Sequence, residues 1–189
     1  MNIKKPKTNF FDLVGDRIYD NHTAAFQDYF RREAEALAPI LARGGRILDV
    51  GCGPGRIFPV VAPYVDELLG IDNSAESVKN AKKVAKKYGS TSTNGLHVLL
   101  EDARDMRASP DIFDAAFLLY NTLGNFRDSK ADYKMAVLEN IRRMLKPSGI
   151  LAISVYAENA APFQIEQYCV WDLLPSTVLP EYTTVVSLG

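Results

Sequence analysis

The sequence predicts an α/β fold: a doubly wound sheet of at least five parallel strands with helices on both faces. Two observations support this prediction. Apolar segments of strand length alternate along the chain with segments whose apolar residues recur at helical spacing. The first of these strands runs directly into a glycine-rich turn, which is typical of a ligand-binding loop. Such alternation implies right-handed crossovers and a sheet that is covered on both sides.

The first elements are a long helix, a strand and a short helix. We expect the long helix from Thr23 to Ala42, because four apolar residues lie at spacings of four and seven and would share one face. The strand is expected from Arg46 to Val50. A helix near Ile57 to Ala62 follows, and Pro59 fits only its first turn. The four apolar residues of the long helix are Phe26, Phe30, Leu37 and Leu41.

The next two strands follow the same order. The second strand is expected from Leu68 to Asp72, and Ser74 is a suitable N-cap for the helix after it. We expect this helix to end at Gly89. The third strand is expected to begin at Leu96, with His97 inside a buried strand.

The fourth and fifth strands complete the predicted sheet. The segment from Phe113 to Leu119 is nearly all apolar, as expected of a central strand that is buried on both faces. We expect Ser129 to cap the following helix and residues 147–149 to form the turn into a fifth strand, Ile150 to Tyr156. After this strand, only Thr183 to Ser187 has a strand-like pattern.

Three glycines stand at alternate positions directly after the first strand, at Gly51, Gly53 and Gly55. Without a Cβ, the first two can adopt positive φ and let a ligand lie against the main chain. A nicotinamide dinucleotide site of the G-x-G-x-x-G type would need its third glycine at position 56, which is Arg56. The pattern therefore favours a different nucleotide ligand.

Acidic residues end three of the predicted strands. Asp49 lies two residues before the first glycine, Asp72 lies 21 residues after it, and Asp102 follows the third strand. A carboxylate at the tip of the second strand can accept hydrogen bonds from both ribose hydroxyls, each worth about 1.5 to 3 kcal/mol. The carboxyl ends of parallel strands meet at one edge of a sheet, so we expect these acids to share a site beside the first strand.

Together, the G-x-G-x-G run and the three acids resemble the class I S-adenosylmethionine (SAM)-dependent methyltransferases over roughly residues 20 to 156. The resemblance implies a Rossmann-like fold, SAM as cofactor and methyl transfer. It also implies that Asp49 orients the methionine amino group, that Asp72 holds the ribose, and that Asp102 with the main chain of Ala103 holds the adenine. The cofactor site implied in full is Asp49, Gly51, Cys52, Gly53, Asp72, Asn73, Asp102, Ala103 and Tyr120.

Two of these residues have a second interpretation. The carboxylate of Asp49 could instead cap the amides of its own turn. Cys52 is interpreted as a spacer within the glycine turn rather than as a nucleophile. Both Cys52 and Cys169 are expected to be reduced, because two cysteines in an otherwise core-forming chain do not indicate a disulfide framework.

No catalytic base is evident. The sulfonium of SAM already activates the methyl group, so in-line positioning can supply about 7 to 11 kcal/mol without an acid or base. An amine or hydroxyl acceptor would still need a base. The candidates are Tyr120 and Asn121, where related enzymes meet the acceptor, and His22, where related enzymes fold a lid. Residues 120–126 lack the prolines of enzymes that methylate the exocyclic amine of a nucleobase or the side-chain amide of glutamine, so we expect a small-molecule acceptor.

Length and charge restrict the other possibilities. With 189 residues, 47% of them hydrophobic, the chain is expected to form one domain: an N-terminal lid and helix (1–43), a core (44–156) and a substrate-side segment (157–189). The net charge of −1 disfavours nucleic acid as a partner. No segment reads as a signal peptide or a membrane span, so we expect a cytoplasmic protein. We expect no metal site, and the sequence does not indicate an oligomeric state.

Three alternatives stay open for the end of the chain. Members of the resembled family follow the fifth strand with two more, so we expect the C-terminal antiparallel hairpin to be missing and the chain to be a fragment. Otherwise residues 183–187 pair with residues 150–156, or the latter remain an apolar edge. Two other functions also stay open: an NAD-dependent oxidoreductase, and a SAM- or nucleotide-binding module without chemistry.

Overall fold

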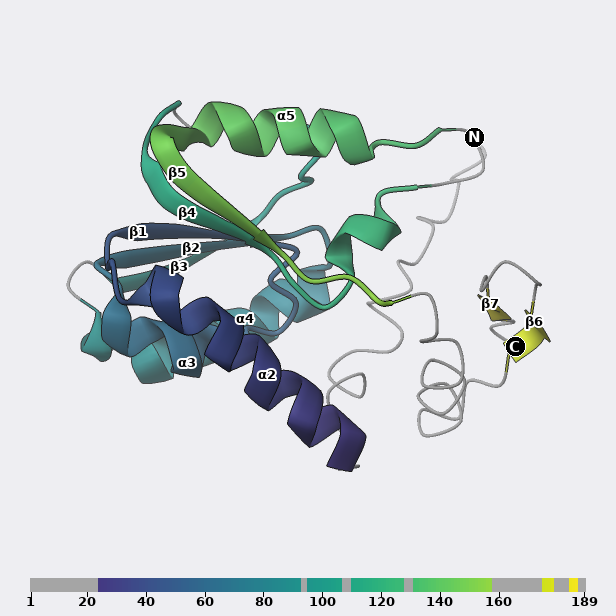
Figure 1. Ribbon diagram of the computed structural model, residues 1–189, viewed down its shortest axis with the longest axis horizontal. Coiled ribbons are helices and arrows are strands. Elements are labelled where there is room, and N and C mark those ends of the chain that lie inside the picture. The colour runs from purple at the N-terminus through teal and green to yellow at the C-terminus, as the bar shows by residue number, and fades with distance from the viewer. Residues whose placement is uncertain are drawn as a thin grey trace, which may run out of the picture.

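The computed structural model describes residues 24–92, 95–106, 110–127, 131–157, 175–178 and 184–186. A five-stranded parallel sheet has the strand order β3-β2-β1-β4-β5, so β1 lies at its centre (Figure 1). The predicted Rossmann-like α/β class is therefore confirmed. The elements are α2 (Ala24–Leu41), β1 (Arg46–Val50), α3 (Phe58–Val61), β2 (Glu67–Asp72), α4 (Ala75–Tyr88), β3 (Gly95–Leu100), β4 (Phe113–Leu118), α5 (Lys134–Met144) and β5 (Leu145–Ile153).

Two cores cover the two faces of the sheet, with α2, α3 and α4 on one side and α5 on the other (Figure 1). Successive residues of β1 belong to different cores: Ile47 packs with α2, α3 and α4, and Leu48 packs with α5. Both side chains are fully buried. The apolar run of a central strand follows directly from this burial on both faces.

Several predicted boundaries agree with the structure. The first helix and the first strand lie where the pattern placed them, and Pro59 occupies the first turn of α3. The hydroxyl of Ser74 caps α4 by accepting a hydrogen bond from the amide of Ser77 at 3.2 Å. Gly89 follows α4 as predicted, but its φ of −62° continues into a 3-10 turn, residues 89–91, rather than a left-handed stop.

The prediction for the third strand is wrong in one respect. β3 pairs only with β2 in the five-stranded sheet and forms its edge, and His97 is exposed on it. Leu96 and Val98 face the core, whereas Leu99 and Leu100 are about half exposed, at 48% and 58%. β3 therefore buries only one face, although its apolar composition is similar to that of a strand buried on both faces.

The last helix and strand also differ from the prediction. α5 begins at Lys134 with Tyr133 at the N-cap position, later than expected, and Ser129 lies outside the described residues. Residues 147–149 do not form a turn before the strand but lie within β5. Phe113 of β4 pairs with Leu145, and Ala115, two residues later, pairs with Ile150. The residues of β5 between Leu145 and Ile150 therefore bulge out of the pairing. β5 ends at Ile153, earlier than expected.

Two short strands, β6 (Pro175–Val178) and β7 (Thr184–Val186), form a separate antiparallel pair. β7 corresponds to the strand expected at residues 183–187, but its pairing with the fifth strand is not observed. β6 was not predicted, because its segment begins with Pro175 and has no alternating apolar pattern. Among the described residues, no helix is both long and apolar enough to cross a bilayer.

Candidate active site

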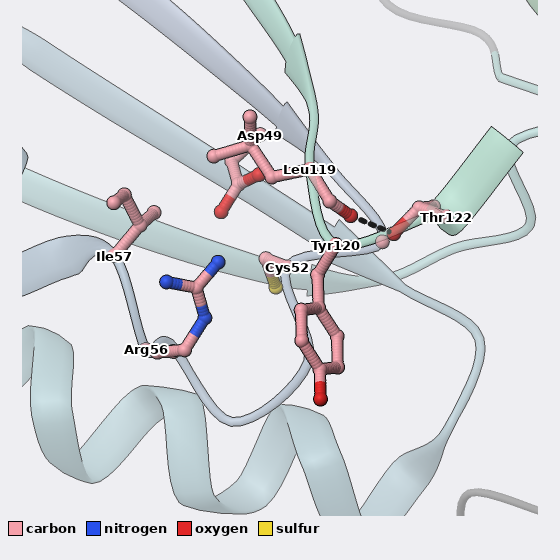
Figure 2. Close-up of a pocket in the computed structure, with 8 residues that line it drawn as sticks. Asp49, Cys52, Arg56, Ile57, Leu119, Tyr120 and Thr122 are labelled. Atoms are coloured by element: carbon pink, nitrogen blue, oxygen red, sulfur yellow. Dashed lines mark hydrogen bonds between the residues drawn. The ribbon is translucent and has the colours of Figure 1, made fainter. Parts of the chain in front are cut away.

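A pocket opens at the carboxyl ends of β1 and β4, where the strand order reverses beside β1 (Figure 2). Its empty space, including the part open to solvent, is about 280 Å³. Such an edge is where open α/β sheets bind their ligands. The residues that line the pocket are Asp49, Gly51, Cys52, Arg56, Ile57, Leu119, Tyr120 and Thr122.

The glycine turn forms one wall of this pocket. Gly51 has a φ of +71°, and its amide donates to the carbonyl of Ile71 on β2 at 2.8 Å. A Cβ at this position would overlap the side-chain methyl of Thr122. Glycine is therefore required here by its φ and by the protein's own packing, in addition to any ligand that lies against the turn.

Asp49 is a buried carboxylate without a local partner. It is 3% exposed, and within the part of the chain that the structure describes no donor reaches its carboxylate oxygens. The amides of Gly51 and Cys52 donate to Ile71 instead, so the alternative in which Asp49 caps its own turn is not observed. Burial raises the pKa of Asp49 to about 7, and the nearby Arg56 opposes that rise. An unpartnered carboxylate of this kind suits a cationic ligand group.

Asp72 links the glycine turn to the end of β2. Its Oδ2 accepts from the amide of Gly53 at 2.9 Å, and its Oδ1 accepts from the amide of Ser74 at 2.8 Å. The neighbouring Asn73 is exposed.

Asp102 lies beyond the pocket lining and forms an ion pair with Arg104. The guanidinium donates to both carboxylate oxygens, from Nε at 2.9 Å and from Nη2 at 2.5 Å, and this pairing lowers the pKa of Asp102. Arg104 also lies 4.9 Å from the ring of Tyr133. The buried Ala103 has its carbonyl occupied by Nδ2 of Asn140 at 3.0 Å.

The turn after β4 has a strained backbone. Tyr120 and Asn121 both have left-handed φ values, of 54° and 59°. Such a conformation costs roughly 1 to 2 kcal/mol for a residue with a Cβ, although Asn tolerates it better than most. Ser154, just after β5, holds the turn: its hydroxyl accepts from the amide of Tyr120 at 2.6 Å, and its carbonyl accepts from the amide of Asn121 at 3.0 Å.

The structure brings together some of the predicted residues but not all of them. Asp49, Gly51, Cys52 and Tyr120 share the pocket. Gly53 and Asp72 lie at its border, whereas Asn73, Asp102, Ala103 and Asn121 are not part of its lining. His22 lies outside the described residues. Burial raises the pKa of the Cys52 thiol well above its usual range, which favours the spacer interpretation over a nucleophile.

Two charged residues at the site, Arg56 in the pocket lining and its partner Glu33, were not among the predicted site residues. Arg56 lines the pocket and pairs with Glu33 of α2 at 2.5 Å. A signal for Glu33 was present, since it lies three residues after Phe30 and four before Leu37, in the middle of an apolar stripe.

Comparisons with known proteins show the family of this chain. A family model described as a methyltransferase domain matches residues 41–177. The chain is 36% identical over 141 residues to a probable methyltransferase, ltbC, of Aspergillus luteorubrus, covering 71% of this chain and 48% of that protein. It is 32% identical over 139 residues to an arsenite methyltransferase of Aquipseudomonas alcaligenes, covering 69% of this chain and 38% of that protein. The chain thus spans less than half the length of these curated relatives.

A solved structure shares the fold. The PH0226 protein of Pyrococcus horikoshii OT3 superposes with a TM-score of 0.68 at 24% sequence identity, and the match covers 94% of this chain and 77% of that one.

Proposed function

This chain belongs to the SAM-dependent methyltransferase family, and on that premise we propose that it binds SAM beside Asp49 and transfers the methyl group to a small-molecule acceptor. One observation carries the placement of the cofactor. Asp49 is a buried carboxylate that lines the pocket and has no hydrogen-bond donor among the described residues. The amino group of SAM is a cation that would supply one.

The charges beside Asp49 suit the rest of an α-amino acid. Arg56 lines the same pocket, and its positive charge, although paired with Glu33, would attract the carboxylate of the ligand. The glycine turn at Gly51 would let the ligand approach the main chain. Asp72, whose carboxylate lies at the end of β2 and is bonded to the amide of Gly53 in the glycine turn, would hold the ribose. Asp102 and Ala103 would hold the adenine, in which case Arg104 shares or releases the carboxylate of Asp102.

The chain's own task is positioning and the exclusion of water. SAM supplies an activated methyl group when it is bound. Aromatic side chains gather where α2 crosses the site: the ring of Tyr120 lies 5.8 Å from Phe30, 5.7 Å from Tyr29 and 6.1 Å from Tyr156. This cluster would keep the reacting groups out of water and hold the acceptor in line.

Two observations support a small-molecule acceptor. One of the similar proteins is an arsenite methyltransferase, whose acceptor is small. The net charge of −1 gives no general attraction to nucleic acid. We expect the proton-accepting group, if the acceptor needs one, to come from the turn at Tyr120 and Asn121 or from the N-terminal segment that contains His22.

Calorimetric titration with SAM, S-adenosylhomocysteine and NAD tests the proposal. We expect binding of the first two ligands and none of NAD. Asp49→Asn should weaken binding, whereas the exposed Asp66→Asn serves as a matched control and should not. Labelled SAM with a library of small metabolites then tests turnover. Binding without turnover of any acceptor would favour the binding module, and binding of NAD alone would refute the proposal.

A further inference from the structure

Glu33 is a buried carboxylate in the apolar stripe of α2. The residue is 7% exposed, and helical spacing places it on the same face as Phe26 and Leu37, both of which are buried. Burying a carboxylate is costly unless it is paired and hydrogen-bonded. The partners of Glu33 come from three different segments of the chain.

We call Glu33 and these partners, Tyr29, Arg56 and Ser154, the Glu33 network. Oε2 of Glu33 accepts from Nη2 of Arg56 at 2.5 Å. Its Oε1 accepts from the hydroxyl of Ser154 at 2.9 Å and from the hydroxyl of Tyr29 at 3.1 Å. Arg56 ends the glycine turn, and Ser154 also holds the strained turn at Tyr120. Glu33 therefore connects α2 to two walls of the pocket.

Arg56 stands between two buried carboxylates. Its guanidinium lies 4.4 Å from the ring of Phe30 and is hydrogen-bonded to Glu33. Figure 2 shows the same group turned toward the side of the pocket where Asp49 lies. The charge of Arg56 already acts on Asp49, because it opposes the rise in the pKa of that carboxyl group. In the structure, Arg56 is thus bonded to Glu33 and acts on Asp49 through its charge.

We propose that Glu33 is a positioning residue that holds the guanidinium of Arg56 against α2 and leaves the carboxylate of Asp49 to the amino group of the cofactor. This inference rests on the proposed function, since it takes the pocket as the SAM site. Without the charge of Glu33, Arg56 turns to Asp49, the other buried carboxylate at this pocket. The new ion pair then occupies the group that the ligand needs.

Glu33→Gln tests the proposal with little change in size, because the amide can still bond to Ser154 and Tyr29. Glu35→Gln is the matched control, since Glu35 lies on the same helix, pairs with Arg31 and has a side chain that is 62% exposed. We expect the affinity for S-adenosylhomocysteine at pH 8 to fall about tenfold or more in Glu33→Gln, as for the loss of a charged hydrogen bond, and to stay unchanged in the control.

Two readouts separate positioning from a purely structural role. The pH midpoint of ligand binding is set by Asp49, which interacts with Arg56, Glu33 and Asp72. In Glu33→Gln this midpoint moves to lower pH, because a negative charge is lost and a positive one approaches Asp49. In an Arg56→Gln background, Glu33→Gln has no further effect on the affinity for S-adenosylhomocysteine, because Glu33 acts through Arg56.

The outcomes are distinguishable. The inference is overturned if wild type binds the ligand and Glu33→Gln binds it equally well, or if the affinity loss comes with a lower melting temperature but an unchanged pH midpoint. It is also overturned if Glu33→Gln costs as much affinity in the Arg56→Gln background as in wild type. Failure of the wild-type chain to bind S-adenosylhomocysteine overturns the proposed function and this inference with it.

Discussion

Cofactor affinity should depend on pH through Asp49. The pKa of this buried carboxyl group is raised to about 7. If only the ionised form accepts the ligand's amino group, the competent fraction rises from about one tenth at pH 6 to about nine tenths at pH 8. The affinity for S-adenosylhomocysteine should then rise about tenfold over this range, which corresponds to about 1.4 kcal/mol.

Calorimetry between pH 6 and pH 8 measures this change. The same series with Asp49→Asn serves as the reference, because dividing the wild-type affinity by that of the variant at each pH removes any titration of the ligand itself. Titration in buffers of different ionisation enthalpy should also show proton release by wild type near pH 7. A wild-type to variant ratio that stays constant across the range would show that Asp49 is not the group that receives the ligand.

Asp49→Asn should become more stable than wild type as pH rises from about 4 to about 7, by up to about 4 kcal/mol in urea unfolding, because the folded-state pKa of Asp49 is raised and its ionisation opposes folding. A difference that does not vary with pH would contradict this. Asn121→Ala should cost about 1 kcal/mol of stability while Asn121→Gly costs none, because the φ of 59° favours glycine. Equal melting temperatures for the two variants would argue against backbone strain. Gly51→Ala should lower the melting temperature and abolish ligand binding, and adding Thr122→Ser, which removes the overlapping methyl, should recover part of the stability. Asp72→Ala should weaken ligand binding about tenfold to a hundredfold, and an unchanged affinity would remove the ribose assignment.

The sheet could be read from the sequence because most of its strands are buried on both faces. The limits of β1 agree with its apolar pattern, and Asp49 marks its carboxyl end. The wrong predictions concern segments whose local sequence pattern fits two different structures. His97 lies in β3, an edge strand whose apolar sequence is similar to that of a fully buried strand. Residues 147–149 are of types common in turns, but here they form a bulge within β5.

The site was less predictable, because its contacts join residues that are far apart in sequence. The glycine turn and the three acids follow from local motifs. The Glu33 network does not, since Glu33 lies 23 residues from Arg56 and 121 residues from Ser154. No sequence pattern indicates which buried carboxylate an arginine will pair with. That choice depends on where α2 crosses the sheet.

A crystal structure of the chain with S-adenosylhomocysteine tests the placement of the cofactor most directly. We expect the amino nitrogen of the ligand within about 3 Å of a carboxylate oxygen of Asp49, a charge-assisted hydrogen bond, with the ribose hydroxyls at Asp72. Arg56 should remain paired with Glu33. Ligand density elsewhere on the protein, or a ligand in this pocket whose amino group contacts neither oxygen of Asp49, would contradict the account.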